Sequence, residues 1–435
     1  MNLAYVRFRG GVHPPEHKEA TEGRVVVRAP VPERIVVPMS QHLGAPNEPV
    51  VAKGDRVRRG EVVGSVEAMV SAPVHSPVDG QVAGVVEVPL APGLRSRAVE
   101  IVPDAEQDLD SFVTLERSED VKAVVRAAGI VGMGGAAFPS AVKLQPPQDM
   151  RISTVILNGC ECEPFLTADH RLMLEQPERV VRGGRLIRDA VGASRVVIGV
   201  EDNKMDAVEA LRAVAGDDVE VAALPTRYPQ GAEKQLIWTL LGKEVPKGKL
   251  PAATGALVHN VGTAAAVADA VDRGKPLIER IVTVTGAVAR PGNYLTLLGT
   301  PVSALIEAAG GLVEPVGRVV SGGPMTGFAL GVLDVPVTKG TSGITVLRAD
   351  QVPPEVYGDQ PCIRCGRCAE ACPIFLRPYA IGIFATGGDW SRAEEAHVLD
   401  CIECGCCAYA CPTSRPLVQL LRRAKQAAML KGAKQ

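Results

Sequence analysis

The amino-acid sequence predicts a multidomain α/β protein, and three observations lead to this prediction. The chain has 435 residues, a length that accommodates roughly two to four domains. Short alternating runs rich in Val, Pro and Gly occupy residues 1–115, whereas helical and strand patterns alternate over residues 116–275. Nine of the eleven cysteines lie between residues 362 and 411, and eight of them form two runs of equal spacing.

Composition and charge indicate a soluble protein whose main partner is not nucleic acid. Hydrophobic residues make up 46% of the chain and charged residues 22%, and the formal net charge is -2. No segment approaches the roughly 18 consecutive apolar residues of a membrane span. The N-terminus MNLAYVRFRGGVHPP lacks the apolar core of a signal peptide. We therefore expect a cytoplasmic chain with reduced thiols, whose cysteines serve metal or redox chemistry.

Residues 1–115 are predicted to form a barrel-sandwich domain. The segments VVAKGDRVRRGEVVGSVEAM and SAPVHSPVDGQVAGV are typical of two similar β-hairpin units. They resemble biotinyl and lipoyl carrier domains, but Val70 occupies the position of the attachment lysine, and no lysine lies between Lys53 and Lys122. We therefore expect a scaffold or docking surface rather than a swinging-arm carrier.

The rest of the chain is predicted to form three further domains and a terminal helix. In residues 116–275, VKAVVRAAGI and DAVEALRAVAG are helical patterns, and STVILNG, SRVVIGVE and VEVAALP are typical of buried strands. This alternation indicates an α/β sandwich with a largely parallel sheet. Residues 280–350 look like a soluble-ligand-binding β-grasp domain. Residues 355–415 hold the cysteine runs, and residues 416–435 form a basic C-terminal helix.

The cysteine runs CIRCGRCAEACP and CIECGCCAYACP both follow the pattern C-x2-C-x2-C-x3-C-P. In this pattern three closely spaced thiolates cap three irons of one 4Fe–4S cubane, and the fourth cysteine ligates the other cluster. A structural zinc ion instead takes two pairs of closely spaced cysteines as its four tetrahedral ligands. Two runs of three closely spaced cysteines, each followed by Cys-Pro, match that pattern poorly. The predicted ligands are Cys362, Cys365, Cys368 and Cys411 for one cluster, and Cys401, Cys404, Cys407 and Cys372 for the other.

The spacer between the two runs includes FLRPYAIGIFATG and SRAEEAHVLD, which have helical character. We therefore expect a helical two-cluster ferredoxin domain, with the clusters acting as a two-step electron path. Cys406 is not part of the repeated pattern and is expected to be a buried bystander.

The segment GIVGMGGAAFPSAVKL contains a candidate phosphate-binding loop. Gly132, Gly134 and Ala137 superficially match the dinucleotide fingerprint, although a helix rather than a strand precedes them. Gly134 and Gly135 allow close backbone approach, and a phosphate on the exposed amides would have Lys143 as its counter-charge. A plain helix-capping turn is the alternative interpretation.

A second candidate loop, NGCECEP, follows a predicted strand. Glu161 and Glu163 lie at the carboxyl end of that strand, where α/β sheets usually bind ligands. Asn158 and the two carboxylates are candidate acceptors for a flavin ring or a nicotinamide ribose, and solvated surface acids are the alternative. Cys160 and Cys162 are too few for a cluster and are expected to be packing residues.

Two further segments are expected to form walls of the same site. They are YPQGAEK, residues 228–234, which is a turn entering a helix, and HNVGT, residues 259–263. His259 is expected to be a structural hydrogen-bonding group rather than a catalytic base.

The order of these loops resembles the flavin-binding fold of the NADH-oxidising subunit of respiratory complex I. That family has a Gly-x-Gly-Gly-Ala-Gly-Phe-Pro loop ending in Lys, an Asn-x-Asp-Glu-Gly-Glu-Pro loop, a Gly-Glu-Glu helix start and an Asn-x-Glu-Thr segment. This chain departs from those motifs at Ala137, Cys160, Cys162, Ala232 and Gly262. The resemblance implies noncovalent FMN and an NAD(H) site, with the cofactor-binding residues Gly132, Gly134, Gly135, Lys143, Asn158, Glu161, Glu163, Tyr228, Gly231, Glu233, Asn260 and Thr263.

Nearly the whole chain resembles the RnfC family, whose members belong to the Rnf complex, the ion-translocating ferredoxin:NAD oxidoreductase. The shared segments include FRGGVHPP, QHLGAP, NGCECEPFLTADHRLMLE, YPQGAEKQLI, GGPMTG, KGTSGI and both cysteine runs. The resemblance implies a peripheral subunit on the cytoplasmic face of the bacterial inner membrane. Its implied partners are the other Rnf complex subunits, especially the iron–sulfur subunit that accepts electrons from ferredoxin.

The resemblance further implies that the protein passes electrons between two 4Fe–4S clusters, FMN and NAD(H), because a flavin links hydride transfer to single-electron steps. No acid or base residue is required, and none is predicted to be catalytic. Two other functions stay open at this point. One is an NADH-dependent flavin and iron–sulfur cobalamin reductase, and the other is a non-catalytic electron wire and docking subunit.

The predicted C-terminal helix is basic, and no acidic residue follows Glu403. A solvated helix end is one interpretation, and a docking helix for a partner or an anionic membrane surface is the other. The basic residues are Arg415, Arg422, Arg423, Lys425, Lys431 and Lys434.

Overall fold

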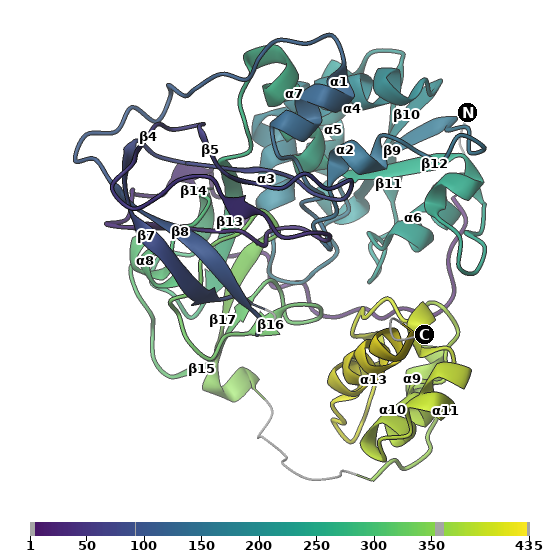
Figure 1. Ribbon diagram of the computed structural model, residues 1–435. Helices are drawn as coiled ribbons and strands as arrows, with labels where there is room; N and C mark the ends of the chain where they lie inside the picture. Colours follow the sequence, from purple (N-terminus) through teal and green to yellow (C-terminus); the bar gives the residue numbers. More distant parts are fainter. Residues whose placement is uncertain (1–4, 92, 353–360, 433–435) are drawn as a thin grey trace.

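The computed structural model describes residues 5–91, 93–352 and 361–432. Figure 1 shows four units: a barrel of two small sheets, an α/β unit, a mixed sheet with one helix, and a helical unit drawn in yellow at the bottom. This arrangement confirms the predicted multidomain α/β fold class.

The first unit is a barrel sandwich. Its strands are β2 (Ile35–Pro38), β3 (Glu48–Pro49), β4 (Arg56–Val57), β5 (Val62–Ser65), β6 (Val74–His75), β7 (Gly80–Pro89) and β8 (Arg95–Pro103). They form a four-stranded sheet in the order β2-β8-β7-β4 and a three-stranded sheet in the order β3-β5-β6. Alternate side chains of these strands turn inward, so that Val37, Val63, Val82 and Ile101 share one core.

Residues 5–24 lie outside both barrel sheets, and we call them the N-terminal strap. The Val6 amide donates to the carbonyl of Thr239 (3.2 Å), and the Gly11 amide donates to the carbonyl of Ala371 (2.9 Å). Figure 1 shows this purple segment descending from the α/β unit to the helical unit. A short strand that follows, β1 (Val27–Arg28), joins the mixed sheet. The predicted domain at residues 1–115 therefore includes residues that contact each of the other units.

The α/β unit is built on a four-stranded sheet in the order β11-β10-β9-β12, and all neighbouring strands are parallel, as predicted. Its strands are β9 (Thr154–Asn158), β10 (Arg195–Glu201), β11 (Val219–Leu224) and β12 (Ala256–Asn260). Its helices are α1 (Val121–Ala127), α2 (Ser140–Lys143), α3 (Ala168–Glu175), α4 (Pro177–Val191), α5 (Met205–Ala215), α6 (Glu233–Leu241) and α7 (Val261–Arg273), with the short 3-10 turns η1 (Asp202–Lys204) and η2 (Pro251–Thr254). Val155 and Leu157 share a core with α4 and α7, whereas Ile156 shares a second core with α6. Helices therefore cover both faces of the sheet, which explains its continuous apolar strands.

The third unit is the predicted β-grasp domain, a mixed sheet in the order β1-β14-β13-β17-β15-β16. Its other elements are β13 (Glu279–Gly286), β14 (Gly292–Leu297), α8 (Val302–Ala308), β15 (Val316–Ser321), β16 (Phe328–Ala329), β17 (Gly343–Arg348) and η3 (Ala349–Gln351). The tight loop between β15 and β16 reaches the α/β unit, as described below.

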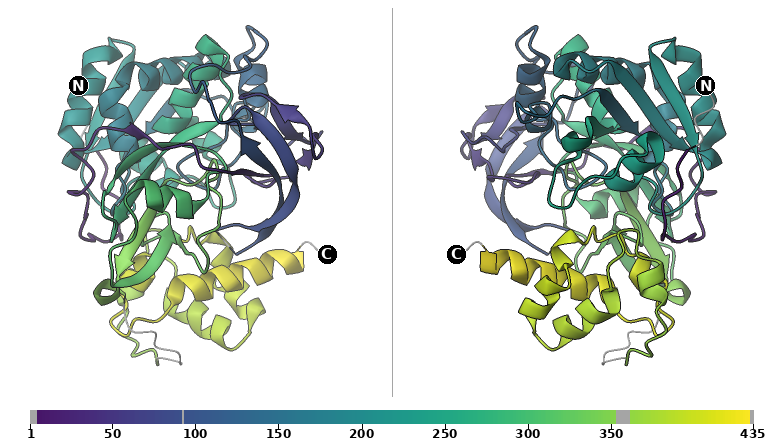
Figure 2. Two further views of the ribbon diagram at one scale, coloured as in Figure 1. Left: turned by 90° about the vertical axis from the view of Figure 1, so that its left-hand side faces the viewer. Right: turned by 90° about the vertical axis from the view of Figure 1, so that its right-hand side faces the viewer.

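The helical unit confirms the predicted helical character of the cysteine domain. It contains α9 (Arg367–Glu370), α10 (Pro378–Thr386), α11 (Trp390–Glu395), η4 (Val398–Asp400), α12 (Cys406–Tyr409) and α13 (Leu417–Gly432). The apolar stripe of α13, including Leu421, Ala424 and Ala428, packs with residues of α10 and α11 in one core. Both side views in Figure 2 show α13 running across this unit.

Several of the predicted basic residues of the C-terminal segment have partners within the helical unit. Arg422 and Lys425 pair with Glu403 at 3.1 Å and 3.0 Å, and Arg423 stacks over Trp390. Lys434 lies outside the described residues. None of the helices in the described ranges combines the length and apolarity needed to cross a bilayer.

Candidate functional site

Two parallel strands, β9 and β12, end side by side in asparagines. Asn158 and Asn260 are direct register partners, and the Asn260 Nδ2 atom donates to the Asn158 carbonyl oxygen at 3.5 Å. Parallel α/β sheets bind ligands at the carboxyl ends of their strands. These two residues therefore mark the edge at which the predicted loops meet.

The glycine loop closes over this edge. The Met133 amide donates to Thr263 Oγ1 at 2.9 Å, which attaches the loop to the first turn of α7. A Cβ atom at Gly134 would lie 2.8 Å from Asn260 Nδ2, so this close approach requires glycine. Gly135 is exposed, and a Cβ atom there would meet no atom within 4 Å. One side of the loop backbone is therefore open to a ligand.

The base of the glycine loop is a narrow turn. The Gly132 amide donates to the carbonyl of Phe138 at 2.9 Å. Ala137 has a φ of 53°, in the left-handed region that glycine adopts most readily. The complex I motif has its fourth glycine at this position, and this chain places an alanine there in a backbone conformation that suits glycine.

The third predicted segment joins the first two. Lys143 Nζ lies 2.7 Å from Glu233 Oε1, and the two side chains are 29% and 38% exposed. Asn158 Nδ2 donates to the Gly231 carbonyl at 2.7 Å. The structure thus brings together Lys143, Asn158, Gly231 and Glu233 at one partly exposed place.

The two carboxylates of the acidic loop have partners within the chain. Glu161 accepts hydrogen bonds from the amides of Asp169 (2.7 Å) and His170 (3.1 Å), so it caps the first turn of α3. Glu163 accepts from the Met325 amide (2.7 Å) and from Thr326 Oγ1 (2.9 Å), in the loop between β15 and β16. Neither carboxylate is a free surface acid, and their contacts with a flavin or nicotinamide stay a prediction.

Lys18 of the N-terminal strap supports the acidic loop, and sequence reasoning missed it. Its side chain is buried, and its Nζ atom donates to the carbonyls of Glu161 (2.9 Å), Glu163 (3.0 Å) and Leu166. Burial lowers the pKa of Lys18. The only signal in the sequence was the strap segment FRGGVHPPEHK, because the three carbonyls lie more than 140 residues further along the chain.

Two buried ionisable groups lie next to these loops. Burial and then the nearby Glu161 carboxylate raise the pKa of Asp169, whose Oδ2 atom accepts from Asn260 Nδ2 at 2.6 Å. Burial and then the charge of Lys143 lower the pKa of His259 to about 3. His259 is therefore neutral at neutral pH, which does not favour a catalytic base, but its buried Nε2 atom has no hydrogen-bond partner among the described residues, so the expected hydrogen-bonding role is not seen at that atom.

Tyr228 points toward the helical unit. Its hydroxyl donates to the main-chain carbonyl of Cys404 at 2.6 Å and lies 3.4 Å from Glu163 Oε2. Its ring packs in a small core with Val12 of the strap and Cys406. Tyr228 and Glu163 therefore lie at the boundary between the flavin-like loops and the cysteine runs.

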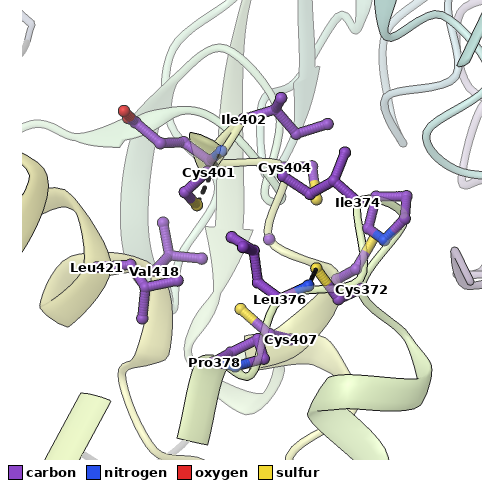
Figure 3. A pocket seen from close by; sticks show the side chains of 14 residues that line it. Cys372, Ile374, Leu376, Pro378, Cys401, Ile402, Cys404, Cys407, Val418 and Leu421 are labelled. Carbon is purple, nitrogen blue, oxygen red and sulfur yellow. Dashed lines mark hydrogen bonds between the residues drawn. The ribbon is translucent and has the colours of Figure 1, made fainter. Parts of the chain in front are cut away.

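Five cysteines line a pocket next to this boundary, which we call the proximal pocket. Cys401, Cys404, Cys406 and Cys407 come from the second run, and Cys372 crosses over from the first. Figure 3 shows their sulfur atoms around the pocket, among apolar side chains such as Leu376. The grouping matches the predicted crossing of the fourth cysteine.

The other four cysteines line a second pocket, which we call the distal pocket. Cys362, Cys365 and Cys368 come from the first run, and Cys411 crosses over from the second. Each pocket thus contains the four thiols that are predicted to ligate one 4Fe–4S cubane. Cys406 is fully buried, as expected, but it also lines the proximal pocket.

The two remaining cysteines occupy the α/β unit. Cys160 is fully buried in the core that contains α6, which confirms its packing role. Cys162 is partly buried and packs against the small core around Tyr228.

Four family models match consecutive parts of the chain. They are described as the RnfC barrel sandwich hybrid domain (residues 6–106), the Nuo51 FMN-binding domain (125–269), the SLBB domain (281–329) and the 4Fe-4S dicluster domain (361–414). Their order is that of the four units in the structure.

Curated relatives match over almost the full length. A protein of Clostridium ljungdahlii, named as the C subunit of a proton-translocating ferredoxin:NAD(+) oxidoreductase complex, is 45% identical over 95% of this chain and 92% of its own. The chain belongs to this RnfC family of ion-translocating ferredoxin:NAD oxidoreductases. The Na(+)-translocating member of Acetobacterium woodii is 46% identical over 98% of both chains, and one from Rhodobacter capsulatus is 42% identical over 96% of this chain and 82% of its own.

A solved structure shares the fold. An NAD+-reducing [NiFe]-hydrogenase in the H2-reduced state superposes with a TM-score of 0.52 over 71% of this chain and 62% of that chain, at 22% identity. At this level of identity the likeness shows a shared fold alone.

The domain assignments make FMN and two 4Fe–4S clusters the cofactors of this RnfC family member. The structure fits both groups. The exposed backbone at Gly135 and the cation of Lys143 suit a phosphate, and each of the two pockets is lined by its four predicted ligand cysteines.

Proposed function

We propose that this chain is the electron-transfer subunit of a membrane-bound, ion-translocating ferredoxin:NAD oxidoreductase, linking two 4Fe–4S clusters, FMN and NAD(H). The family membership supports this activity. The observation that carries the proposal is the direct contact between the proximal pocket and the loops of the FMN-binding domain.

Hydrogen bonds between described residues support that contact. Tyr228 donates to the Cys404 carbonyl, and Gln235 Nε2 donates to the Pro373 carbonyl at 3.1 Å. The strap adds the bond from the Gly11 amide to Ala371. Because Cys404 lines the proximal pocket and Pro373 follows its crossing cysteine, these bonds hold that pocket against the α/β unit.

The residues that would hold the cofactors follow from the sites described above. The glycine loop and Lys143 would bind the FMN phosphate. Asn158, Gly231, Asn260 and Thr263 shape the remainder of that site, which we also assign to NAD(H). When bound, the flavin links two-electron hydride transfer to the one-electron chemistry of the clusters. We assign the four predicted ligand cysteines of each pocket to one cluster.

The distal pocket is the place where a partner would exchange electrons. Cys365 is exposed, and the neighbouring Ile363 is 60% exposed. We assign this surface to another member of the complex, the iron–sulfur subunit that accepts electrons from ferredoxin. The proposed location is the cytoplasmic face of the bacterial inner membrane, with this chain attached peripherally.

The test is anaerobic purification of the full chain, followed by measurement of flavin, iron and the response to NADH. We expect one FMN and about eight irons per chain, with cluster absorption bleached by NADH. Eight irons without flavin or NADH response would contradict the proposal and favour a non-catalytic electron wire and docking subunit. NADH-dependent cobalamin reduction without membrane association would favour the cobalamin reductase.

A further inference from the structure

The two cysteine runs are related by an internal repeat, so that each position around one cluster pocket has an equivalent around the other. In both runs the residue two positions after the first cysteine has positive φ, 58° at Arg364 and 57° at Glu403. The residue three positions after the crossing cysteine also has positive φ, 60° at Phe375 and 49° at Ser414. Positions can therefore be compared one by one.

The equivalent positions differ in charge. Four residues after the crossing cysteine, the proximal pocket has Leu376 and the distal pocket has Arg415. The equivalents of Glu403 and Cys406 in the second run are Arg364 and Arg367 in the first. All three exchanges make the surroundings of the distal pocket more positive.

Arg415 is the strongest of these differences because it is buried. It is 8% exposed and lines the distal pocket together with the four cysteines. Its Nη1 atom is buried and has no hydrogen-bond partner among the described residues. A Cβ atom at Gly382 of α10 would lie 3.9 Å from that Nη1 atom, so the guanidinium is enclosed between α10 and the pocket.

The charged groups next to the proximal pocket largely neutralise one another. Among the described residues that line the proximal pocket, Glu403 is the one with a charged side chain. Arg422 and Lys425 of α13 pair with its carboxylate, and Lys425 Nζ also donates to the Cys401 carbonyl at 2.8 Å. Neither cation lines the pocket, where the remaining wall is apolar.

We propose that Arg415 is the buried counter-charge of the distal cluster and makes that cluster the more easily reduced of the two. The proposal rests on the proposed function through the assignment of one cluster to each pocket. Reduction adds one electron, and thus one negative charge, to a cluster. An unpaired cation in a low-dielectric site stabilises that added charge, and charge and solvent exposure are among the factors that set cluster potentials.

The exposure of the two pockets acts in the same direction. Cys365 of the distal pocket is exposed, whereas the proximal pocket lies against the α/β unit. A chain that holds a single electron therefore carries it on the distal cluster, next to the surface assigned to the partner. The electron stays there until the partner or the proximal cluster accepts it.

The test is an EPR-monitored redox titration of the full chain purified anaerobically. The Cys365→Ser variant identifies the distal signal, because it alters that cluster alone. In the wild type, the first electron should produce the signal that this variant changes. Arg415→Leu copies the residue at the equivalent position of the first run. It should lower the equilibrium constant for reduction of the distal cluster about tenfold, which corresponds to 59 mV for a one-electron couple. The equilibrium constant for reduction of the proximal cluster should change less than twofold.

Matched variants separate charge from packing. Arg415→Gln is a second neutral variant in case Arg415→Leu disturbs folding, and it should give the same shift. Arg415→Lys keeps the positive charge, so the reduction potential of the distal cluster should stay close to the wild-type value. Arg367→Leu removes an exposed cation that solvent screens, so it should change the equilibrium constant for reduction of the distal cluster less than threefold.

Either of two results would overturn the inference: unchanged distal potential in both neutral variants, or a first electron on the proximal cluster of the wild type. A wild-type chain without eight irons would contradict the proposed function instead.

Discussion

The hydroxyl of Tyr228 donates a 2.6 Å hydrogen bond to the main-chain carbonyl of Cys404, across the boundary between the α/β unit and the helical unit. Tyr228 is 3% exposed, so this bond is made away from water. The same tyrosine also contacts the N-terminal strap, because Val12 and Tyr228 form an isolated antiparallel bridge. One residue thus connects the strap, the FMN-binding domain and a cysteine of the proximal pocket.

Tyr228→Phe should slow the NADH-driven reduction of the clusters without loss of iron or flavin. The change removes one hydrogen bond, worth about 1 kcal/mol net, and leaves the Cys404 carbonyl without this partner. We expect bleaching to be slower by a factor of about five, measured by anaerobic stopped-flow absorbance. Tyr294→Phe is the matched control, because the Tyr294 hydroxyl donates to the Arg290 carbonyl at 2.7 Å in the β-grasp domain. Equal effects of the two variants would refute a specific role for the Tyr228 bond.

Lys18→Met should weaken FMN binding and leave both clusters in place. The three main-chain carbonyls that Lys18 holds would lose their donor inside the protein, and an unsatisfied buried polar group costs about 1–3 kcal/mol. The acidic loop should therefore lose its shape, with FMN affinity falling at least about tenfold in a fluorescence titration of the deflavinated chain. Lys53→Met, an exposed lysine of the barrel, is the control and should bind FMN normally.

The sequence alone predicts that these loops meet at one site, because their motifs occur in the same order as in a family of known fold. The motifs alone therefore assign Lys143, Gly231 and Asn260 to one site. The cysteine pockets were accessible for a different reason, since ligand spacing within each run is local and the crossing follows from the repeat.

Other features depend on contacts that no local pattern encodes. Lys18 looks like any solvated lysine until the strap is placed against the acidic loop. Glu161 is a predicted ligand group, and the local sequence does not reveal that its carboxylate also caps α3, which begins at Ala168. Arg415 was assigned to a basic helix, but it precedes α13 and is buried in the distal pocket.

Stability should fall as pH decreases below about 6.5, because buried histidines stay neutral in the folded chain. Burial lowers the pKa of His42 to about 4, and of His75 and His259 to about 3. Between these values and the ordinary value of about 6.5, the unfolded chain binds a proton that the folded chain does not, so acid favours unfolding. His75 and His259, which are almost fully buried, then each cost about 1.4 kcal/mol per pH unit, and the partly exposed His42 costs less.

His259→Gln tests this dependence with one residue. The variant has no titratable group at this position, so its stability relative to the wild type should improve by about 1.4 kcal/mol between pH 7.5 and pH 5.5. Urea midpoints followed by circular dichroism at the two pH values measure that difference. A pH-independent difference would show that His259 does not resist protonation in the folded chain.

The crossing of the fourth cysteine predicts which cluster each substitution removes. Cys411→Ala should deplete the cluster assigned to the first run, and Cys372→Ala the cluster assigned to the second, because each of these residues lies in the pocket of the other run. Iron should fall from about eight toward about four per chain in either variant, measured with the EPR signals of the reduced protein.

Double variants make the assignment decisive. Adding Cys365→Ser to Cys411→Ala should cause little further loss, because both residues line the distal pocket. Adding Cys404→Ser to Cys411→Ala should remove the remaining iron, because Cys404 lines the proximal pocket. The reverse pattern would mean that each run binds its own cluster with all four of its cysteines. In that case Arg415 would flank the cluster of the second run, and the order of the two potentials would have to be assigned anew.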